Sequence, residues 1–414
     1  MLSIENYYEI KKYSDDQWQL IRHFQTQREQ LKNDAFLSAN HSCLIGEKGV
    51  GKTILACQKA MSMKANDTSE ILYASLDDTL FSSYSMFDIA RMAQEHDIKL
   101  VVFDEVHRYV NWKTDLKSIC DRLKIRTIVS GSSILSFDDL GGLARRIVKY
   151  ELKGMSFREY LNLSYQTQIE RIELPYLLNN SPTIGAEIKQ QLEAKIERNL
   201  GSLFEEYLKK GYYAYSLTEP NLENFLQMLR QATEDTIAYE IILSQSHSRP
   251  DMSRKLQMLF KAIAQNVPYT VHYQSLQKYA GITDLRTLKH YLACLEKAGI
   301  ISRLDKKTLK SLRKADKLYL GNTSLYFAYA NLNPNIGSLR ETFFLNSLRL
   351  AKFEVLAHDG RADFAVDDYV FEVGGPNKSW QQLKEQDNAF LIKDINDISA
   401  NPKIIPLWLF GFLA

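Results

Sequence analysis

The chain has 414 residues, enough for about two to four domains and for more than one buried core. Its 52 lysine and arginine residues nearly balance its 50 aspartate and glutamate residues, giving a formal net charge of +2. This balance excludes a uniformly basic nucleic-acid coat protein and an acidic tail protein, although a local basic patch stays open. With 45% hydrophobic and 25% charged residues, the composition also argues against general disorder.

The cysteines and the apolar segments indicate the environment of the protein. The four cysteines are far apart and form no Cys-x-x-Cys pair, which argues against a disulfide framework or a zinc site. Residues 1–16 contain no apolar segment typical of a secretory signal, and the most apolar stretch, residues 404–414, is too short to span a bilayer. We therefore expect a soluble, cytoplasmic protein without a membrane partner.

The first motif with chemical meaning is glycine-rich. An apolar run at residues 43–45 leads into the pattern Gly46-x-x-x-x-Gly51-Lys52-Thr53, and residues 53–65 continue with helical spacing. Strand, glycine loop and helix in this order predict a phosphate-binding P-loop; the alternative is a glycine turn before a helix. The glycines let backbone N–H groups approach phosphate oxygens, and the helix amino terminus attracts the anion.

Within this loop we assign two roles. Lys52 is predicted to reach the β and γ phosphates of a bound nucleotide, and the Thr53 hydroxyl is predicted to bind Mg²⁺. The predicted nucleotide-binding residues form one continuous segment: Gly46, Glu47, Lys48, Gly49, Val50, Gly51, Lys52, Thr53 and Ile54.

Two further strands follow the loop. Residues 71–76 predict a strand, followed by a helix that ends near Glu95. Residues 98–105 read IKLVVFDE, a continuous apolar run typical of a strand covered on both faces, and it ends in Asp104 and Glu105. We predict that Asp104 holds Mg²⁺ through water and that Glu105 is the general base for an attacking water. The alternative is a surface acidic pair after a core strand.

The last two strands of this region are predicted at residues 126–130 and 147–152. Five strands alternating with helices predict an α/β domain with a parallel, doubly wound sheet. Ser130 and Ser132 follow the fourth strand and are candidates for sensing the γ phosphate or the attacking water. An ordinary polar turn is the alternative for this segment.

Together these segments resemble prokaryotic AAA-type P-loop ATPases that carry a winged helix and a C-terminal domain with a degenerate PD-(D/E)xK nuclease-like core. The resemblance covers nearly the whole chain and implies ATP as the nucleotide. The segments that carry it are GEKGVGKT (46–53), LYASLDD (72–78), VVFDEVHRY (101–109), TIVSGSS (127–133), ARRIVKYELKGMSFREYL (144–161), YLKKGYY (207–213), and the C-terminal GRADF and FEVGGPNK.

The resemblance also implies a phosphate-contacting arginine after the fourth strand, just before a Leu-x-Pro-Leu-Ser-Phe-x-Glu stretch. In this chain Gly154 replaces the proline, and the matching arginine is Arg145 or Arg146. Such a cation acts in cis, or in trans from a neighbouring subunit of a ring or dimer, and offsets charge on the transferred phosphoryl group. A solvated arginine pair at a strand start is the alternative.

The rest of the chain is expected to form three further domains after an ATPase core at residues 1–161. Residues 162–250 have mainly helical patterns and predict a lid. Residues 251–330 read as helix, glycine turn, helix and hairpin, the order of a winged helix. Its second helix, residues 284–298, exposes basic side chains that suit nucleic acid, as does the wing, although a winged helix can also contact a protein partner. The basic residues are Arg286, Lys289 and His290 of the helix, and Arg303, Lys306, Lys307, Lys310, Arg313, Lys314 and Lys317 of the wing.

The C-terminal domain is expected at residues 331–414, after a linker at residues 331–334, with a polar helix near 379–393 and a last strand at 404–410. The resemblance implies that Glu341, Asp363 and Glu372 match the carboxylates of a nuclease. The lysine expected two residues after the last acid is absent, because that position is Gly374. Lys378 replaces it only if the glycine turn folds it back toward Glu372, so nuclease activity is not expected.

The leading functional hypothesis is an ATPase whose nucleotide state moves the lid and the winged helix and thereby controls binding to nucleic acid or to a protein partner. Three alternatives stay open: a nucleotide-switched DNA-binding regulator without turnover, an ATP-gated nuclease and a P-loop kinase. An oligomer is compatible with the sequence, which does not fix its size.

Overall fold

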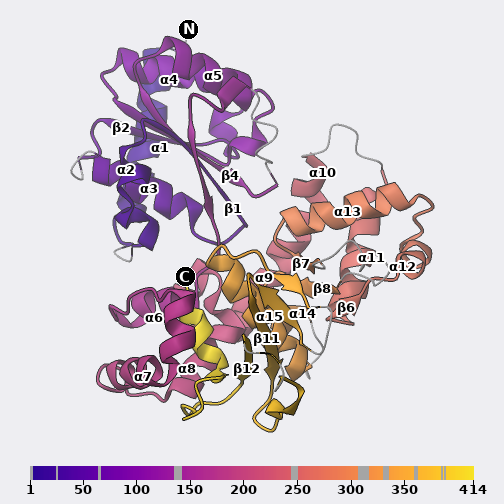
Figure 1. Cartoon of the computed structure of the whole chain (residues 1–414). Helices are drawn as coiled ribbons and strands as arrows, with labels where there is room; N and C mark the ends of the chain where they lie inside the picture. The colour runs from indigo at the N-terminus through magenta and orange to yellow at the C-terminus, as the bar shows by residue number, and fades with distance from the viewer. Residues whose placement is uncertain are drawn as a thin grey trace. The chain divides into compact units, whose positions relative to one another are not determined.

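The computed structural model describes residues 3–24, 27–63, 67–134, 142–243, 250–305, 317–329, 335–358, 362–383, 386 and 388–414 (Figure 1). The chain forms two compact units, Met1–Lys153 and Gly154–Ala414. The second unit contains the residues predicted to form the lid, the winged helix and the C-terminal domain, and it also takes in residues 154–161 of the predicted ATPase core. The finer division of the second unit stays a prediction.

The first unit is built on a five-stranded sheet with strand order β2-β3-β4-β1-β5. Every pairing is parallel, which confirms the predicted parallel α/β fold. The strands are β1 (His41–Gly46), β2 (Ile71–Ser75), β3 (Leu100–Asp104), β4 (Arg126–Ser132) and β5 (Val148–Leu152). Strands β2 and β3 are buried along their whole length, as their unbroken apolar sequences require.

Helices flank both faces of this sheet (Figure 1). The chain crosses from β1 to the far edge strand β2 and then returns through β3 and β4, so right-handed crossovers place α3 on one face and α4 and α5 on the other. The helices are α1 (Ile4–Ile21), α2 (Asp34–Ser38), α3 (Lys52–Met63), α4 (Met86–Glu95) and α5 (Trp112–Arg122). Because all strands run the same way, the loops after β1, β3 and β4 meet at one edge of the sheet.

The second unit begins with helices, as predicted for residues 162–250, and residues 244–249 lie outside the described residues. These helices are α6 (Phe157–Tyr165), α7 (Leu174–Glu193), α8 (Leu200–Glu206), α9 (Leu222–Asp235) and α10 (Ile241–Leu243). Tyr212 and Tyr213 are buried here and form part of the core.

A helix, a short strand, two helices and two strands follow. They are α11 (Met252–Ala264), β6 (Tyr269–Thr270), α12 (Tyr273–Ala280), α13 (Leu285–Lys297), β7 (Ile301–Leu304) and β8 (Lys317–Leu320), followed by α14 (Thr323–Tyr329). The three strands form an antiparallel sheet in the order β6-β8-β7. Gly281, at a φ of +63°, ends α12, and Asp284 caps α13 by accepting from the Thr287 N–H. The tip of the predicted wing, residues 306–316, and the predicted linker lie outside the described residues.

The C-terminal segment packs helix α15 (Ile336–Leu350) against a second five-stranded sheet of order β13-β12-β11-β10-β9. Its strands are β9 (Leu356–Ala357), β10 (Phe364–Val366), β11 (Tyr369–Gly374), β12 (Ala389–Lys393) and β13 (Ile404–Pro406). Strands β9, β10 and β11 pair antiparallel, whereas β11, β12 and β13 pair parallel.

Two predicted C-terminal elements are corrected by the structure. The expected helix near 379–393 is wrong: Trp380–Leu383 form a 3₁₀ turn, and Ala389–Lys393 form strand β12. Residues 389–392 are four consecutive apolar residues, and all four are buried in the sheet, which suits a covered strand better than a polar helix. The expected strand at 404–410 stops at Pro406, and Leu407–Phe412 continue as a 3₁₀ helix.

No helix among the described residues is long and apolar enough to cross a membrane.

The second unit begins at a glycine that a tyrosine ring covers. A Cβ atom built on Gly154 would collide with the ring of Tyr212, which is itself buried. The neighbouring Met155 N–H donates to the Tyr212 carbonyl (2.8 Å), and the Tyr207 hydroxyl donates to the Met155 carbonyl (2.8 Å). An aromatic ring therefore fills the space that a side chain at this position would need, which suits the glycine found here.

We predict that Gly154→Ala destabilises the second unit by about 1–3 kcal/mol, because the added methyl group overpacks a buried ring. Chemical denaturation measures the effect, and adding Tyr212→Leu to the variant is expected to restore part of the loss. Gly142→Ala is the matched control, since its Cβ would meet only the Lys117 side chain at 3.6 Å or more. Equal stability of the two glycine variants would contradict the packing argument.

Candidate functional site

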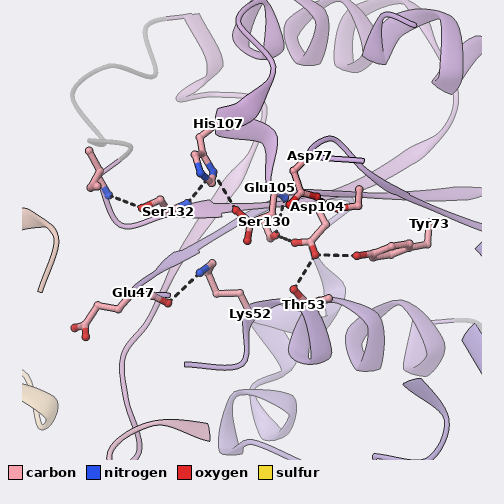
Figure 2. A network of polar contacts seen from close by, with 12 residues as sticks. Glu47, Lys52, Thr53, Tyr73, Asp77, Asp104, Glu105, His107, Ser130 and Ser132 are labelled. Atoms are coloured by element: carbon pink, nitrogen blue, oxygen red, sulfur yellow. Dashed lines mark hydrogen bonds and ion pairs between the residues drawn. The ribbon is translucent and has the colours of Figure 1, made fainter. Parts of the chain in front are cut away.

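The glycine-rich loop lies between β1 and α3. Gly49 and Gly51 have φ angles of +87° and +95°, a region in which a side chain would be strained. Lys52 opens α3, and its Nζ donates to the Glu47 carbonyl (3.0 Å), so the lysine closes the loop on itself (Figure 2). This backbone has the conformation that a phosphate-binding loop requires.

Asp104 is the centre of the polar network beside this loop (Figure 2). Its carboxylate accepts hydrogen bonds from the Thr53 hydroxyl (2.7 Å), the Tyr73 hydroxyl (2.9 Å) and the Ser130 hydroxyl. These donors come from α3, β2 and β4, the elements around the carboxyl end of β3. Asp104 is only 3% exposed, and hydrogen bonds to a buried carboxylate offset the cost of removing it from water. The structure thus brings together Thr53 and Asp104, the pair predicted to hold Mg²⁺.

Glu105 has a different environment from its neighbour. Its backbone is left-handed (φ +54°), which turns the chain away from the strand direction, and its side chain is 29% exposed. Its Oε2 lies 3.3 Å from Nδ1 of His107, and its N–H donates to the Ser130 hydroxyl (3.4 Å). The left-handed residue therefore directs a partly exposed carboxylate toward the same edge at which Asp104 is buried.

The two predicted serines have separate contacts. The Ser130 hydroxyl lies between Asp104 and the Glu105 backbone, whereas the Ser132 N–H donates to Nδ1 of His107 (3.4 Å). Both belong to β4, which pairs with β1 through Gly46↔Ser132, so they lie beside the glycine loop. The segment is a buried strand end and not a surface turn.

The two predicted arginines lie away from this network. Arg145 and Arg146 precede β5, whose register with β1 aligns Val148 with Ser42 at one end and Leu152 with Gly46 at the other. They therefore lie at the edge of the sheet opposite to Lys52. Arg146 binds both carboxylate oxygens of Asp121, at 2.5 and 2.9 Å, and lowers the pKa of that exposed carboxyl through these hydrogen bonds. The structure does not bring either arginine to the glycine loop of the same chain.

Three residues of the site have no role assigned from the sequence. Tyr73 binds Asp104 from β2, and burial together with that carboxylate raises the pKa of its hydroxyl. His107 contacts Glu105 and Ser132, and Arg28 donates to the Val50 carbonyl of the glycine loop. Residues 101–109 include His107, but only the fold reveals which atoms it meets.

The donors at this edge suit Mg²⁺. The Thr53 hydroxyl and the Asp104 carboxylate are oxygen ligands, and Mg²⁺ in nucleotide sites takes few protein ligands, completing its shell with phosphates and water. The described residues contain no group of three or more His, Cys, Asp or Glu side chains arranged to hold a metal ion. A threonine and one carboxylate beside a phosphate loop fit the magnesium ion that accompanies a nucleotide.

A second cluster of charged residues lies in the C-terminal sheet. The Tyr319 hydroxyl donates to Glu341 (2.7 Å), and Asp363 accepts from the Val373 N–H (3.0 Å). Burial and, next, the Asp363 charge raise the pKa values of Glu341 and Glu372. The structure thus gathers the three carboxylates that the resemblance implied.

Lys378 folds back onto this cluster. Its Nζ forms an ion pair with Glu372, chiefly through a hydrogen bond that raises the lysine pKa. A Cβ on Gly374 would lie 2.6 Å from the Cβ and Cγ of Lys378, so the lysine stem crosses the glycine where no side chain stands. This meets the condition set for Lys378 from the sequence, but the metal ligands of a nuclease are not arranged in the described residues.

The predicted nucleic-acid surface is only partly described. Arg286, Lys289 and His290 are exposed on α13, and Nζ of Lys289 lies 5.4 Å from the Tyr273 ring centroid. Arg303 pairs with Asp305 (3.0 Å) and Glu296 (3.9 Å), which reduces the charge at the base of the wing. The basic residues from Lys306 to Lys314 lie outside the described residues.

Comparisons with known proteins support the first unit most directly. Residues 39–161 match the family model described as an AAA domain, and residues 201–335 match a domain of unknown function (DUF8612). An uncharacterized protein of Methanocaldococcus jannaschii is 25% identical over 401 residues, which covers 89% of this chain and 84% of that protein. Residues 39–161 thus form an AAA-type P-loop ATPase domain.

Two solved structures are distantly similar to this chain. A RuvB variant of Thermotoga maritima has a TM-score of 0.29 and 15% identity, over 75% of this chain and 94% of that one. Cdc6p of Pyrobaculum aerophilum has a TM-score of 0.26 and 12% identity, over 70% of this chain and 86% of that one. These scores are too low to carry over any property of those proteins.

We predict that Lys378→Met lowers the melting temperature most at alkaline pH, because it leaves three carboxylates without their cation. A carboxyl group whose pKa is raised on folding stabilises the fold while it is protonated, and this stability is lost as pH rises through the folded pKa. The loss in Lys378→Met should therefore shrink between pH 8 and pH 5, as thermal unfolding would measure.

The matched control is Lys393→Met, whose Nζ donates instead to the Pro376 carbonyl (3.0 Å). A pH-independent loss in Lys378→Met, or the same pH dependence in both variants, would contradict the coupling between Lys378 and the carboxylates.

Proposed function

We propose that the AAA-type domain of residues 39–161 binds ATP with Mg²⁺ and hydrolyses it. The observation that carries this proposal is the 2.7 Å hydrogen bond from the Thr53 hydroxyl to Asp104. It joins the end of the glycine loop to an acid on a separate strand, so two groups that suit one metal ion lie at one point. A glycine turn without a nucleotide would not need a buried carboxylate there.

The proposed chemistry assigns one task to each group. The loop amides and Lys52 bind the phosphates, and Thr53 with Asp104 would hold Mg²⁺, which when bound neutralises charge on the β and γ phosphates. Glu105 accepts a proton from the attacking water, and His107 lies beside its carboxylate. Ser130 and Ser132 orient the groups that face the γ phosphate.

We further propose that the nucleotide state repositions the winged-helix region and the C-terminal domain on nucleic acid or on a protein partner. The exposed basic residues of α13 support the nucleic-acid form of this output. The edge position of Arg145 and Arg146 favours an arginine finger that acts in trans, in an oligomer, over one that acts on the same chain. A nucleotide-switched regulator without turnover and an ATP-gated nuclease are the remaining candidates. Lys378 beside Glu372 favours the nuclease, whereas the described part of the chain holds no group of three His, Cys, Asp or Glu side chains placed for a metal ion, which opposes it.

We predict that the protein releases phosphate from ATP only when Mg²⁺ is present. Lys52→Ala should lose nucleotide binding, because the cation that faces the phosphates is removed. Glu105→Gln should bind Mg²⁺–ATP with similar affinity but turn over at least about a hundredfold more slowly, in line with typical general-base contributions. Calorimetry and a phosphate-release assay measure these two quantities separately.

Glu95→Gln, a change at the exposed end of α4, is the control for the loss of one negative charge. Normal turnover in Glu105→Gln would refute the base assignment. If the unchanged protein binds Mg²⁺–ATP tightly but releases no phosphate, without any partner and also at high protein concentration, the nucleotide-switched regulator would be favoured.

We also predict that DNA binding falls steeply with salt concentration. Replacing Arg286 and Lys289 together by glutamate should weaken binding and reduce the slope of log affinity against log salt by about two, because each phosphate contact releases about one counterion. Fluorescence anisotropy with and without Mg²⁺–ATP measures this slope. The control is the double variant Arg171→Glu with Lys352→Glu, which changes the net charge by the same amount. Equal effects of the two double variants on DNA binding would remove nucleic acid from the proposal. The absence of any salt-sensitive DNA binding would do the same.

A further inference from the structure

Arg28 reaches the glycine loop from outside it. It lies in the segment between α1 and α2 and is only 7% exposed. Its Nη1 donates to the Val50 carbonyl (2.7 Å), and its Nη2 donates to the Lys153 carbonyl (3.0 Å). One guanidinium group therefore joins the middle of the loop to the residue that follows β5.

The bond to Val50 acts on more than one residue, because a peptide group is planar and trans. The Val50 carbonyl and the Gly51 N–H belong to the same plane and point in opposite directions. A donor that fixes the carbonyl on the outside of the loop therefore fixes the N–H on the other side. The positive charge also polarises this peptide group and makes its N–H a better donor to an anion.

The backbone conformation of Gly51 does not by itself fix that plane. Its φ of +95° lies where glycine moves freely, and Gly49, at +87°, gives the peptide before it the same freedom. Val50 between them is fully buried, so its carbonyl needs a protein partner, and the Arg28 guanidinium supplies it. The Arg28 contact thus restrains a peptide group that lies between two conformationally free glycines.

The second bond explains why an arginine suits this place. β5 runs directly beside the loop, since a Cβ on Gly46 would collide with the Leu152 carbonyl. The two carbonyls that Arg28 binds, of Val50 and Lys153, thus belong to adjoining segments. A planar guanidinium donates to both at once from a fixed geometry, whereas a lysine ammonium is a single point on a flexible stem.

We propose that Arg28 is a positioning residue of the nucleotide site, which holds the Val50–Gly51 peptide so that the Gly51 N–H donates to a phosphate oxygen. This inference rests on the proposed nucleotide binding and adds to it a residue outside every phosphate-site motif of the sequence. Arg28 does not touch the nucleotide itself. Its contribution is orientation of a donor before the nucleotide arrives.

The test observes the Gly51 amide directly in the full-length protein. The sequence contains two Val-Gly pairs, Val50–Gly51 and Val373–Gly374. Labelling valine with ¹³C at the carbonyl and glycine with ¹⁵N therefore selects two amide signals, and Gly374 of the second unit is the internal reference. Addition of Mg²⁺–ADP should shift the Gly51 signal and leave that of Gly374 in place. Calorimetry on the same samples measures affinity.

Arg28→Met should abolish or strongly reduce the Gly51 shift and weaken Mg²⁺–ADP binding by about tenfold or more, the expected size for a lost charge-assisted hydrogen bond. Arg28→Lys keeps the positive charge but cannot donate to both carbonyls from one planar group. Its affinity and its Gly51 shift should therefore lie between those of the unchanged protein and Arg28→Met. It is also the variant to use if Arg28→Met does not fold. Arg126→Met, an exposed change at the opposite end of β4, should match the unchanged protein.

A purely structural role predicts another result. In that case Arg28→Met would melt at a lower temperature while its folded form kept the same affinity and the same Gly51 shift, and the inference would be overturned. If the unchanged protein itself shows neither heat of binding nor a Gly51 shift, the proposed nucleotide site fails, and the inference fails with it. Normal binding in the unchanged protein together with normal binding in Arg28→Met rejects the inference alone.

Discussion

The buried carboxylate of Asp104 can exist in this fold only because hydroxyl groups from three other elements surround it. An ionised carboxylate that leaves water without partners is strongly destabilising. Thr53, Tyr73 and Ser130 supply those partners, and each reaches Asp104 because all five strands run in one direction and end at one edge. The sheet therefore determines the site: an antiparallel strand among these five would carry its polar end to the other edge.

The parts of this site that can be predicted from the sequence are those in which a reactive or phosphate-binding residue stands directly after a predicted strand. The glycine loop, Asp104 and Glu105 each stand at the end of an unbroken apolar strand, and the positions after such strands converge whatever else the fold contains. Tyr73 and Arg28 could not be found in this way. They lie 31 and 22 positions along the chain from the residues that they contact, and a tyrosine in a strand or an arginine in a loop has no pattern that shows its partner.

The C-terminal sheet contains two further features that its sequence pattern does not reveal. Residues 379–393 were expected to be one helix because polar residues dominate their first half, yet the buried run at 389–392 pairs with β11. The position of Lys378 is the second feature. Its position in the sequence is wrong for the lysine of the resembling family, but its side chain reaches Glu372 by crossing Gly374. A motif defined by spacing misses a group that arrives at the same place from another position in the chain.

Two adjacent acids at one strand end have separate surroundings because the backbone turns between them. Asp104 ends a regular strand, and its carboxylate points toward the three hydroxyl groups and is 3% exposed. The backbone of Glu105 is left-handed, and its own side chain lies beside His107 and is 29% exposed. A left-handed conformation costs a non-glycine residue about 1 kcal/mol or more, so it persists only where the surroundings impose it. The Ser130 hydroxyl contributes to both sides, since it donates to Asp104 and accepts from the Glu105 N–H. One serine thus contacts both the buried carboxylate and the backbone turn that exposes the next one, and it helps to separate the surroundings of the acid proposed to bind the metal from those of the acid proposed as the base.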